Sequence, residues 1–247
     1  MTIKAETWAR FSKRLSKINA EAARLIQEWI DKNGLEDVDA LIDYTYGVAT
    51  KYGEAAGALS AELYDAIAEL SGAMVEPAEL APTPSYGEMA KTVRGVLKQS
   101  RNVAMIAAAV GRQVKRCGAE TTLRNAERDR AEYAWIAIGD TCPYCLAIAA
   151  EGWKRATVGT SHADHIHGNC DCTYTVRFNK DTRIAGYDPS KYRRMFDNAE
   201  GETEEEKLNS LRREAYAENK DDINAQKRSA YEKRQERNSS EAEEIDV

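Results

Sequence analysis

The stretch WARFSKRLSKINAEAARLIQEWIDKNG, residues 8–34, indicates the fold class more clearly than any other part of the chain. Its apolar residues recur at alternating intervals of three and four positions, which places them along one side of a helix. This seam consists of Trp8, Phe11, Leu15, Ile18, Ala22, Leu25 and Trp29. Asn33-Gly34 then ends the pattern with residues that tolerate the positive φ common at helix C-termini. We expect a long amphipathic helix that packs within the chain.

A second long helix is expected from about residue 38 to residue 70, where apolar residues again keep a helical period. Gly47, Gly53 and Gly57 weaken it locally but allow a neighbouring helix to approach closely. The next stretch, EPAELAPTPSYG at 76–87, holds three of the five prolines and is expected to be a loop or linker.

Helices are expected to resume at about Glu88. One face of the next helix carries Val103, Ile106, Val110, Val114 and Cys117. Cys117 is therefore interpreted as a buried small hydrophobe and not as a ligand. We expect Gly118 to end this helix, and Thr121 or Thr122 to cap a further helix that runs to Arg130.

The pattern changes after residue 132. YAWIAI (133–138) and the alternating TYTVRF (173–178) predict strands, and CPYCLAIAA (142–150) predicts a short helix. The fold class expected is mainly α with a small α+β module stapled by Cys and His. Long antiparallel helices precede a short β-hairpin or sheet, and a helical tail follows. The expected divisions are a helical domain at 1–132, the Cys/His module at 133–180, and a charged, partly helical tail at 181–247.

Composition limits the function classes. The 247 residues are 43% hydrophobic and 31% charged, and the apolar run 104–110 is far shorter than the ~20 residues that span a bilayer. The N-terminus lacks the apolar region of a signal peptide, so no membrane association and no export through the Sec pathway are expected.

Charge is unevenly distributed along the chain. The net charge is −6, yet residues 91–130 carry 10 basic and 3 acidic side chains, a local excess of +7. This segment either pairs with the acidic helices before it or faces phosphate groups, which gives salt-dependent, sequence-independent binding. The candidate nucleic-acid or partner-binding residues are Lys91, Arg94, Lys98, Arg101, Arg112, Lys115 and Arg116.

Four of the five cysteines and all three histidines fall within the 31 residues 142–172. A Cys-x-x-Cys turn supplies two thiolates to one tetrahedral zinc, and a second pair comes from elsewhere in the fold. The candidate metal ligands are Cys142, Cys145, His167, Cys170 and Cys172. They allow a Cys₃His or a Cys₄ site for one structural zinc; otherwise the same thiols form disulfides.

A catalytic interpretation of this cluster is weaker. Asp164-His165-Ile166 imitates the core of HNH nucleases, in which a histidine activates water beside a hydrolytic metal. Asn169 follows His165 by only four residues, however, so the usual spacer is missing. We therefore expect a protein that is not an enzyme. The alternatives are an HNH-like metal-dependent nuclease and a small zinc-bearing nucleic-acid-binding module.

The run TTLRNAERDRAEYAWIAIGDTCPYCLAIAAEGW (121–153), with HGNCDCTYTVRF (167–178) after it, resembles minor head proteins of tailed bacteriophages. These are the Mu F-like head morphogenesis proteins, especially the branch common in phages of actinobacteria. ALSAELYD (58–65) also resembles the family's helical half, and the resemblance covers roughly residues 40–180. The matching positions are Thr122, Leu123, Trp135, Cys142, Cys145, His167, Cys170 and Cys172.

The resemblance implies a virion component and not an enzyme. Such a protein is made in the cytoplasm of the host bacterium and lies in the head interior or portal region. Its implied partners are the phage portal protein, the major capsid protein or both, with non-specific contact to packaged DNA. A role in head assembly and DNA packaging is therefore expected.

Overall fold

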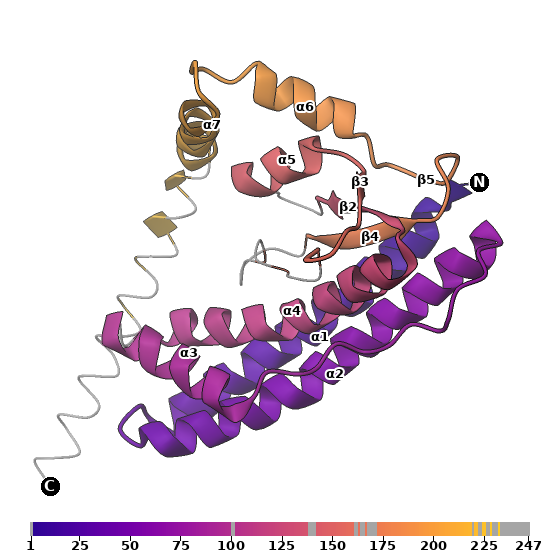
Figure 1. The fold of residues 1–247 in the computed structure, drawn as a ribbon. Helices are drawn as coiled ribbons and strands as arrows, with labels where there is room; N and C mark the ends of the chain where they lie inside the picture. The colour runs from indigo at the N-terminus through magenta and orange to yellow at the C-terminus, as the bar shows by residue number, and fades with distance from the viewer. Residues whose placement is uncertain are drawn as a thin grey trace, which may run out of the picture.

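The computed structural model describes residues 2–99, 102–137, 142–160, 163, 166 and 172–218, with residues 220, 221, 224, 225, 228 and 232 of the tail. The described chain is mainly helical, as predicted. Three long helices lie side by side: α1 (Ala5–Asn33), α2 (Val38–Ser71) and α4 (Val103–Asp129), while the shorter α3 (Tyr86–Gln99) packs on α2 and α4 (Figure 1). Among the described helices, none has the long apolar stretch that crossing a membrane takes.

The buried side of α1 differs in part from the predicted seam. Ile18, Leu25 and Trp29 are only half-buried, and Asn19, Ile26 and Ile30 are buried instead. Apart from Ser12, the buried residues of the helix are Trp8, Phe11, Leu15, Asn19, Ala22, Ile26 and Ile30. Their spacing is three, four, four, an 11-residue repeat over three turns that stays close to the natural helical period. A strict three-four seam drifts around the helix, so its later members leave the core.

Two glycines allow α2 and α4 to pack closely, as predicted. A Cβ at Gly53 would lie 2.8 Å from Cys117 Sγ, and one at Gly57 would lie 3.2 Å from Thr121 Oγ1, whereas Gly47 has no neighbour within 4 Å. Residue numbers rise in the same direction along both helices at these contacts, so α2 and α4 run parallel. α1 runs antiparallel to both, because only the short connection 34–37 joins it to α2.

The predicted helix end at Gly118 is wrong, because α4 continues without a break to Asp129. A Cβ at Gly118 would lie 2.9 Å from Ser60 Oγ and 3.1 Å from the Ala56 carbonyl oxygen. The glycine therefore serves the packing against α2 and does not terminate the helix. The left-handed residue at the end of α4 is Arg130, with φ 52°.

Both predicted strands are present. β2 (Glu132–Ile136) pairs antiparallel with β4 (Thr173–Arg177) and with the two-residue β3 (Lys154–Arg155), in the order β3-β2-β4. The predicted short helix is α5 (Pro143–Ala150), and α6 (Pro189–Asp197) and α7 (Glu204–Glu218) lie beyond it (Figure 1).

A pairing between the chain's N-terminus and the segment after β4 was not predicted. β1 (Thr2–Ile3) forms a parallel pair with β5 (Arg183–Ile184). Ile3 and Ile184 join the same hydrophobic cluster as the long helices, and so do Ile136 of β2 and Val176 of β4. The helical body and the small sheet therefore share one core.

Candidate functional site

The cysteines around α5 and β4 form part of a second, smaller core. Cys145 is fully buried in the first turn of α5, and Cys172, 4% exposed, immediately precedes β4. Both belong to a cluster with Trp135 and Tyr174, whose rings meet edge to face at 4.6 Å between centroids. Cys142, the residue before α5, packs against this cluster.

Three of the five predicted ligands, Cys142, Cys145 and Cys172, share this hydrophobic cluster, and His167 and Cys170 lie outside the described residues. His162, His165 and Asn169 lie outside them as well, so the nuclease-like Asp-His-Ile motif has no described geometry. Within the described part of the chain, no three His, Cys, Asp or Glu side chains are placed to hold a metal ion.

Cys117 is separate from that cluster, as predicted. It lies in α4 at 3% exposure, and its thiol donates to the Gln113 carbonyl oxygen at 3.3 Å. Burial, with a smaller contribution from nearby Glu120, raises the pKa of this thiol to about 12, and Arg116 opposes the shift. A thiol that stays protonated is a packing group and a poor metal ligand.

At the edge of the small sheet, two oppositely charged residues lie directly opposite each other on neighbouring strands. Glu132 of β2 is directly opposite Arg177 of β4, and the two side chains form an ion pair of 2.6 Å. The Arg177 guanidinium also lies 4.6 Å from the ring centroid of Trp153. These contacts fix the loop after α5 to the sheet edge.

The predicted basic residues do not form one stripe. Lys91, Arg94 and Lys98 are exposed, and their spacing of three and four puts them on one face of α3. Arg94 pairs with Asp39 of α2 at 2.9 Å, which agrees with the interpretation that the basic segment pairs with the acidic helices.

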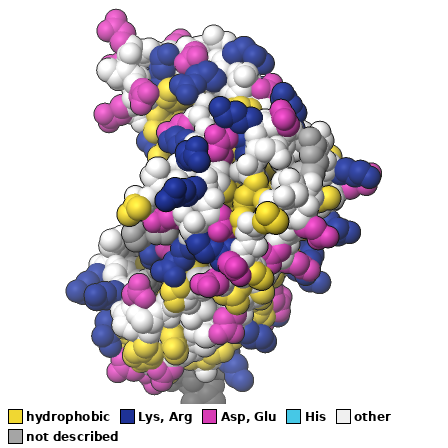
Figure 2. Space-filling view, turned by 45° about the vertical axis from the view of Figure 1, so that its right-hand side comes forward, with side chains coloured by type: hydrophobic (Ala, Val, Ile, Leu, Met, Phe, Trp, Pro, Cys, Tyr) yellow, Lys and Arg dark blue, Asp and Glu magenta, His cyan; other side chains and the backbone are white. Residues whose placement is uncertain are grey.

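On α4 the predicted basic residues have different surroundings. Arg112 is exposed, Lys115 is 9% exposed, and Arg116 pairs with Glu120 at 2.6 Å. Arg101 lies outside the described residues. Figure 2 shows Lys and Arg interspersed with Asp and Glu over the face that it presents.

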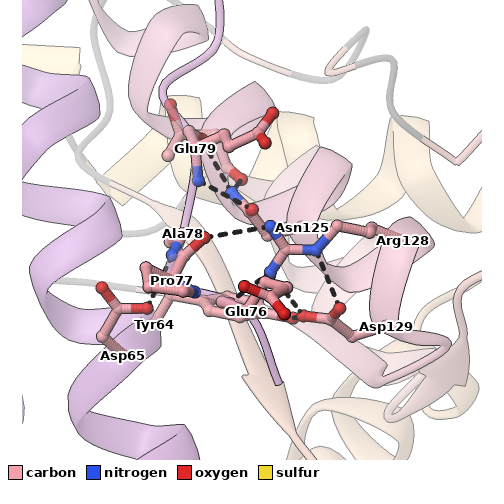
Figure 3. Close-up of polar contacts among 10 residues, drawn as sticks. Tyr64, Asp65, Glu76, Pro77, Ala78, Glu79, Asn125, Arg128 and Asp129 are labelled. Atoms are coloured by element: carbon pink, nitrogen blue, oxygen red, sulfur yellow. Dashed lines mark hydrogen bonds and ion pairs between the residues drawn. The ribbon is translucent and has the colours of Figure 1, made fainter.

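Sequence reasoning missed the role of the proline-containing segment, residues 76–85, called here the strap. The strap runs extended along α4, and side chains of the helices satisfy its backbone (Figure 3). Asn125 Oδ1 accepts from Glu79 N at 2.9 Å, and Asn125 Nδ2 donates to Glu79 O at 2.8 Å. Thr121 Oγ1 accepts from Ala81 N at 3.0 Å, and Asp65 of α2 accepts from Ala78 N at 2.8 Å.

Arg128 completes this arrangement, which we call the α4 ladder (Thr121, Asn125 and Arg128). It donates to the carbonyl oxygens of Pro77 at 3.0 Å and Glu76 at 2.6 Å, and its partner Asp129 accepts from Tyr64 Oη at 2.7 Å (Figure 3). The ion pair with Asp129 raises the pKa of Arg128. Burial and the bond to Asp129 raise the pKa of Tyr64. The sequence signal that could have indicated this role is the spacing of Thr121, Asn125 and Arg128, which are polar residues four and three positions apart within one helix.

The model of the VG15 protein family matches residues 2–199, which include the long helices, the strap, the small sheet and α6. No curated protein and no solved structure matches the chain.

Proposed function

Because this chain belongs to the VG15 protein family, a viral gene-product family, we propose that it is a structural and assembly component of a phage or prophage head. Membership of this family is consistent with a phage-encoded protein. The finer assignment, to the Mu F-like minor head proteins, rests on the resemblance of residues 121–153 and 167–178. The observation that carries the proposal is the family match across both the helical body and the Cys-containing module.

The architecture supports a structural role. The shared core, the pairing of β1 with β5 and the α4 ladder connect segments far apart in the sequence into one body. We propose that the portal protein, the inner capsid surface or both bind this body during assembly, in the head interior. Lys91 and Lys98, exposed on α3, are the residues we assign to non-specific contact with packaged DNA.

We also propose that a structural zinc staples the small module. Cys145 and Cys172 belong to one hydrophobic cluster, against which Cys142 packs, and His167 and Cys170 are the remaining candidate ligands. Thiolates and imidazoles are the ligands that structural zinc takes, and bound zinc contributes directly to folding.

A nonsense codon in this gene tests the assembly role. In a phage or inducible prophage that carries the gene, we expect loss of DNA-filled heads and restoration by a wild-type copy supplied in trans. Normal particle yield without the protein would contradict the proposal.

A further inference from the structure

Helix α5 is apolar on all sides. Its sequence, PYCLAIAA, holds no charged side chain, and every residue of Pro143–Ala150 is buried or half-buried. Strand β2, α6 and α7 pack against it. A short helix without a polar face needs a cover on each side, and α7 supplies the cover on one of them.

The helix α7 is attached to this surface by few buried side chains. Ser210 is the one buried residue of Glu204–Glu218. Three half-buried residues share one face of the helix at three- and four-residue spacing, Leu208, Leu211 and Ala215. Figure 1 shows α7 next to α5 and α6 and away from the long helices. A helix with so little burial belongs to the part of a fold that opens most readily.

The hinge between α6 and α7, residues 198–203, is short and mostly exposed. Gly201 has φ 135°, and a Cβ there would lie 2.6 Å from Glu206 Cβ and 2.8 Å from Lys207 N. The hinge therefore folds back on the first turn of α7 in a conformation that favours glycine. Lys207 Nζ also donates to the Asp197 carbonyl oxygen at 3.1 Å, an exposed bond that water replaces when the hinge opens.

The core of the protein does not include α7. Neither hydrophobic cluster of the described residues contains a side chain of this helix. The family model matches residues 2–199 and so ends before α7 begins at Glu204. Release of α7 therefore leaves both clusters in place and uncovers apolar surface on α5, which is unfavourable in water.

We propose that α7 exchanges between two copies of this chain, so that the α7 of each copy covers the α5 of the other. The second copy is the occupant that the structure supports, because the contacts made between copies are those that α7 makes within one copy. Exchange of an identical element needs no new complementary surface and is a simple route to a dimer. It goes beyond the proposed head role, since it involves only α5, α7 and the hinge of this chain.

Concentration decides which form is populated. A short linker holds α7 near its own α5 at an effective concentration in the millimolar range. We expect the full-length chain to be monomeric at about 10 µM and to contain a measurable dimer at about 1 mM. Size-exclusion chromatography with light scattering measures both states.

A substitution in the hinge should shift this balance. Gly201→Ala opposes the folded-back conformation, so the dimer should appear at a concentration at least about tenfold lower than in the wild type. Gly159→Ala is the matched control. Gly159 also has a positive φ, of 92°, but nothing lies within 4 Å of a Cβ there and it is outside the hinge. This variant should behave as the wild type does.

Substitutions on α7 test whether this helix forms the dimer. Leu208→Asp with Leu211→Asp removes the apolar face of α7 and, added to Gly201→Ala, should restore the monomer. Arg213→Asp with Ala217→Asp, at exposed positions of the same helix, should leave the Gly201→Ala dimer intact. Circular dichroism checks that the long helices persist in each variant.

A labelled peptide of residues 203–218 tests whether α5 accepts an α7 from outside the chain. By fluorescence anisotropy it should bind the chain that carries Leu208→Asp and Leu211→Asp, whose own α7 no longer competes. It should bind the wild type at least about tenfold more weakly, because the chain's own α7 occupies the surface.

Three outcomes overturn the exchange. One is a Gly201→Ala chain that stays monomeric at about 1 mM, and another is a dimer that persists after both leucines are replaced by aspartate. Equal binding of the peptide to the wild type and to the leucine variant is the third, since it places the peptide elsewhere. Peptide binding to the leucine variant without any dimer of Gly201→Ala assigns α7 to a cover that a different helix displaces, and not to an exchanged arm.

Discussion

The side-chain amide of Asn125 and the backbone of Glu79 hold each other through two hydrogen bonds, of 2.9 and 2.8 Å. Asn125 Nδ2 also donates to the Thr121 carbonyl oxygen at 2.7 Å, so the amide is held on its own helix as well. This pair is the centre of the α4 ladder, through which a proline-containing segment of mostly exposed side chains acquires one conformation. The strap is specified by bonds to its backbone more than by burial of its side chains.

Replacing Asn125 with leucine removes both bonds to Glu79. Glu79 is exposed, so water compensates in part, and we expect the free energy of unfolding to fall by about 1–2 kcal/mol. Urea denaturation measures this change. Asn198→Ala, at an exposed position after α6, is the control and should change stability by less than about 0.5 kcal/mol. Equal stability of the two variants would contradict the ladder.

The glycines of the long helices should respond in opposite directions to alanine. Gly47→Ala adds a methyl group where nothing lies within 4 Å, so we expect a gain of about 0.5–1 kcal/mol from helix propensity. Gly118→Ala places a Cβ 2.9 Å from Ser60 Oγ and 3.1 Å from the Ala56 carbonyl oxygen, and should cost about 1–3 kcal/mol. Thermal or urea unfolding compares them. Stabilisation by both substitutions would show that α2 and α4 do not approach closely here.

A double substitution tests the same interface at Gly53. Gly53→Ala alone should destabilise the protein by about 1–3 kcal/mol, because its Cβ would lie 2.8 Å from Cys117 Sγ. In a Cys117→Ala background the sulfur is absent, so the cost of Gly53→Ala should shrink to less than half. A double-mutant cycle from urea denaturation gives the coupling. Additive effects would contradict this contact.

Much of this architecture follows from local patterns. The ends of α1 and α2, the strands β2 and β4 and the helix α5 are predicted within a few residues, because apolar period and capping residues are local properties. Tertiary contacts decide the rest. In the sequence Gly118 resembles a helix end, and only its contact with Ser60 shows that it is a packing residue. The buried face of α1 likewise depends on which of its residues α2 and α4 cover. The pairing of Ile3 with Ile184 joins two-residue strands, which leave no periodic signal.

The cysteines of the candidate site could be identified from the sequence, but their surroundings could not. The spacing of Cys142 and Cys145 predicted a turn with two thiols, and the structure adds the Trp135 and Tyr174 rings around Cys145 and Cys172. The basic segment was visible as a charge excess, yet Lys115 is buried and Arg94 is paired with Asp39, which composition along the chain does not reveal.

The buried thiol of Cys117 should make stability depend on alkaline pH. Burial raises its folded-state pKa to about 12 from the ordinary value of 9.0, so the unfolded thiol ionises first as pH rises. The folded state then binds the extra proton, and the free energy of unfolding falls from about pH 9 toward pH 12, by at most about 1.4 kcal/mol per pH unit. Below about pH 8 both states carry the neutral thiol and the effect is absent.

Comparison with Cys117→Ala isolates this contribution from the lysines and tyrosines that titrate in the same range. We expect the stability of the wild type, measured by urea denaturation from pH 8 to pH 10.5, to fall more steeply than that of the variant. Parallel pH profiles would contradict a buried, protonated Cys117.

The zinc staple makes a prediction about metal content. Protein purified without chelator should contain about one zinc per chain by elemental analysis, and Cys145→Ser should lose the metal and unfold at a lower temperature. Cys117→Ala is the matched control, and it should keep the metal because Cys117 lies in α4 away from the cluster of Cys145 and Cys172. Less than a stoichiometric amount of metal, with a mobility shift on reduction, would instead show that disulfides hold the module.

The measurement that tests the head role most directly is the protein composition of purified, DNA-filled particles. Quantitative mass spectrometry of particles from a phage or induced prophage that carries this gene should find the chain in a few copies per head, retained after nuclease treatment and a salt wash. Particles that contain the portal and major capsid proteins but lack this chain would contradict its assignment as a head component.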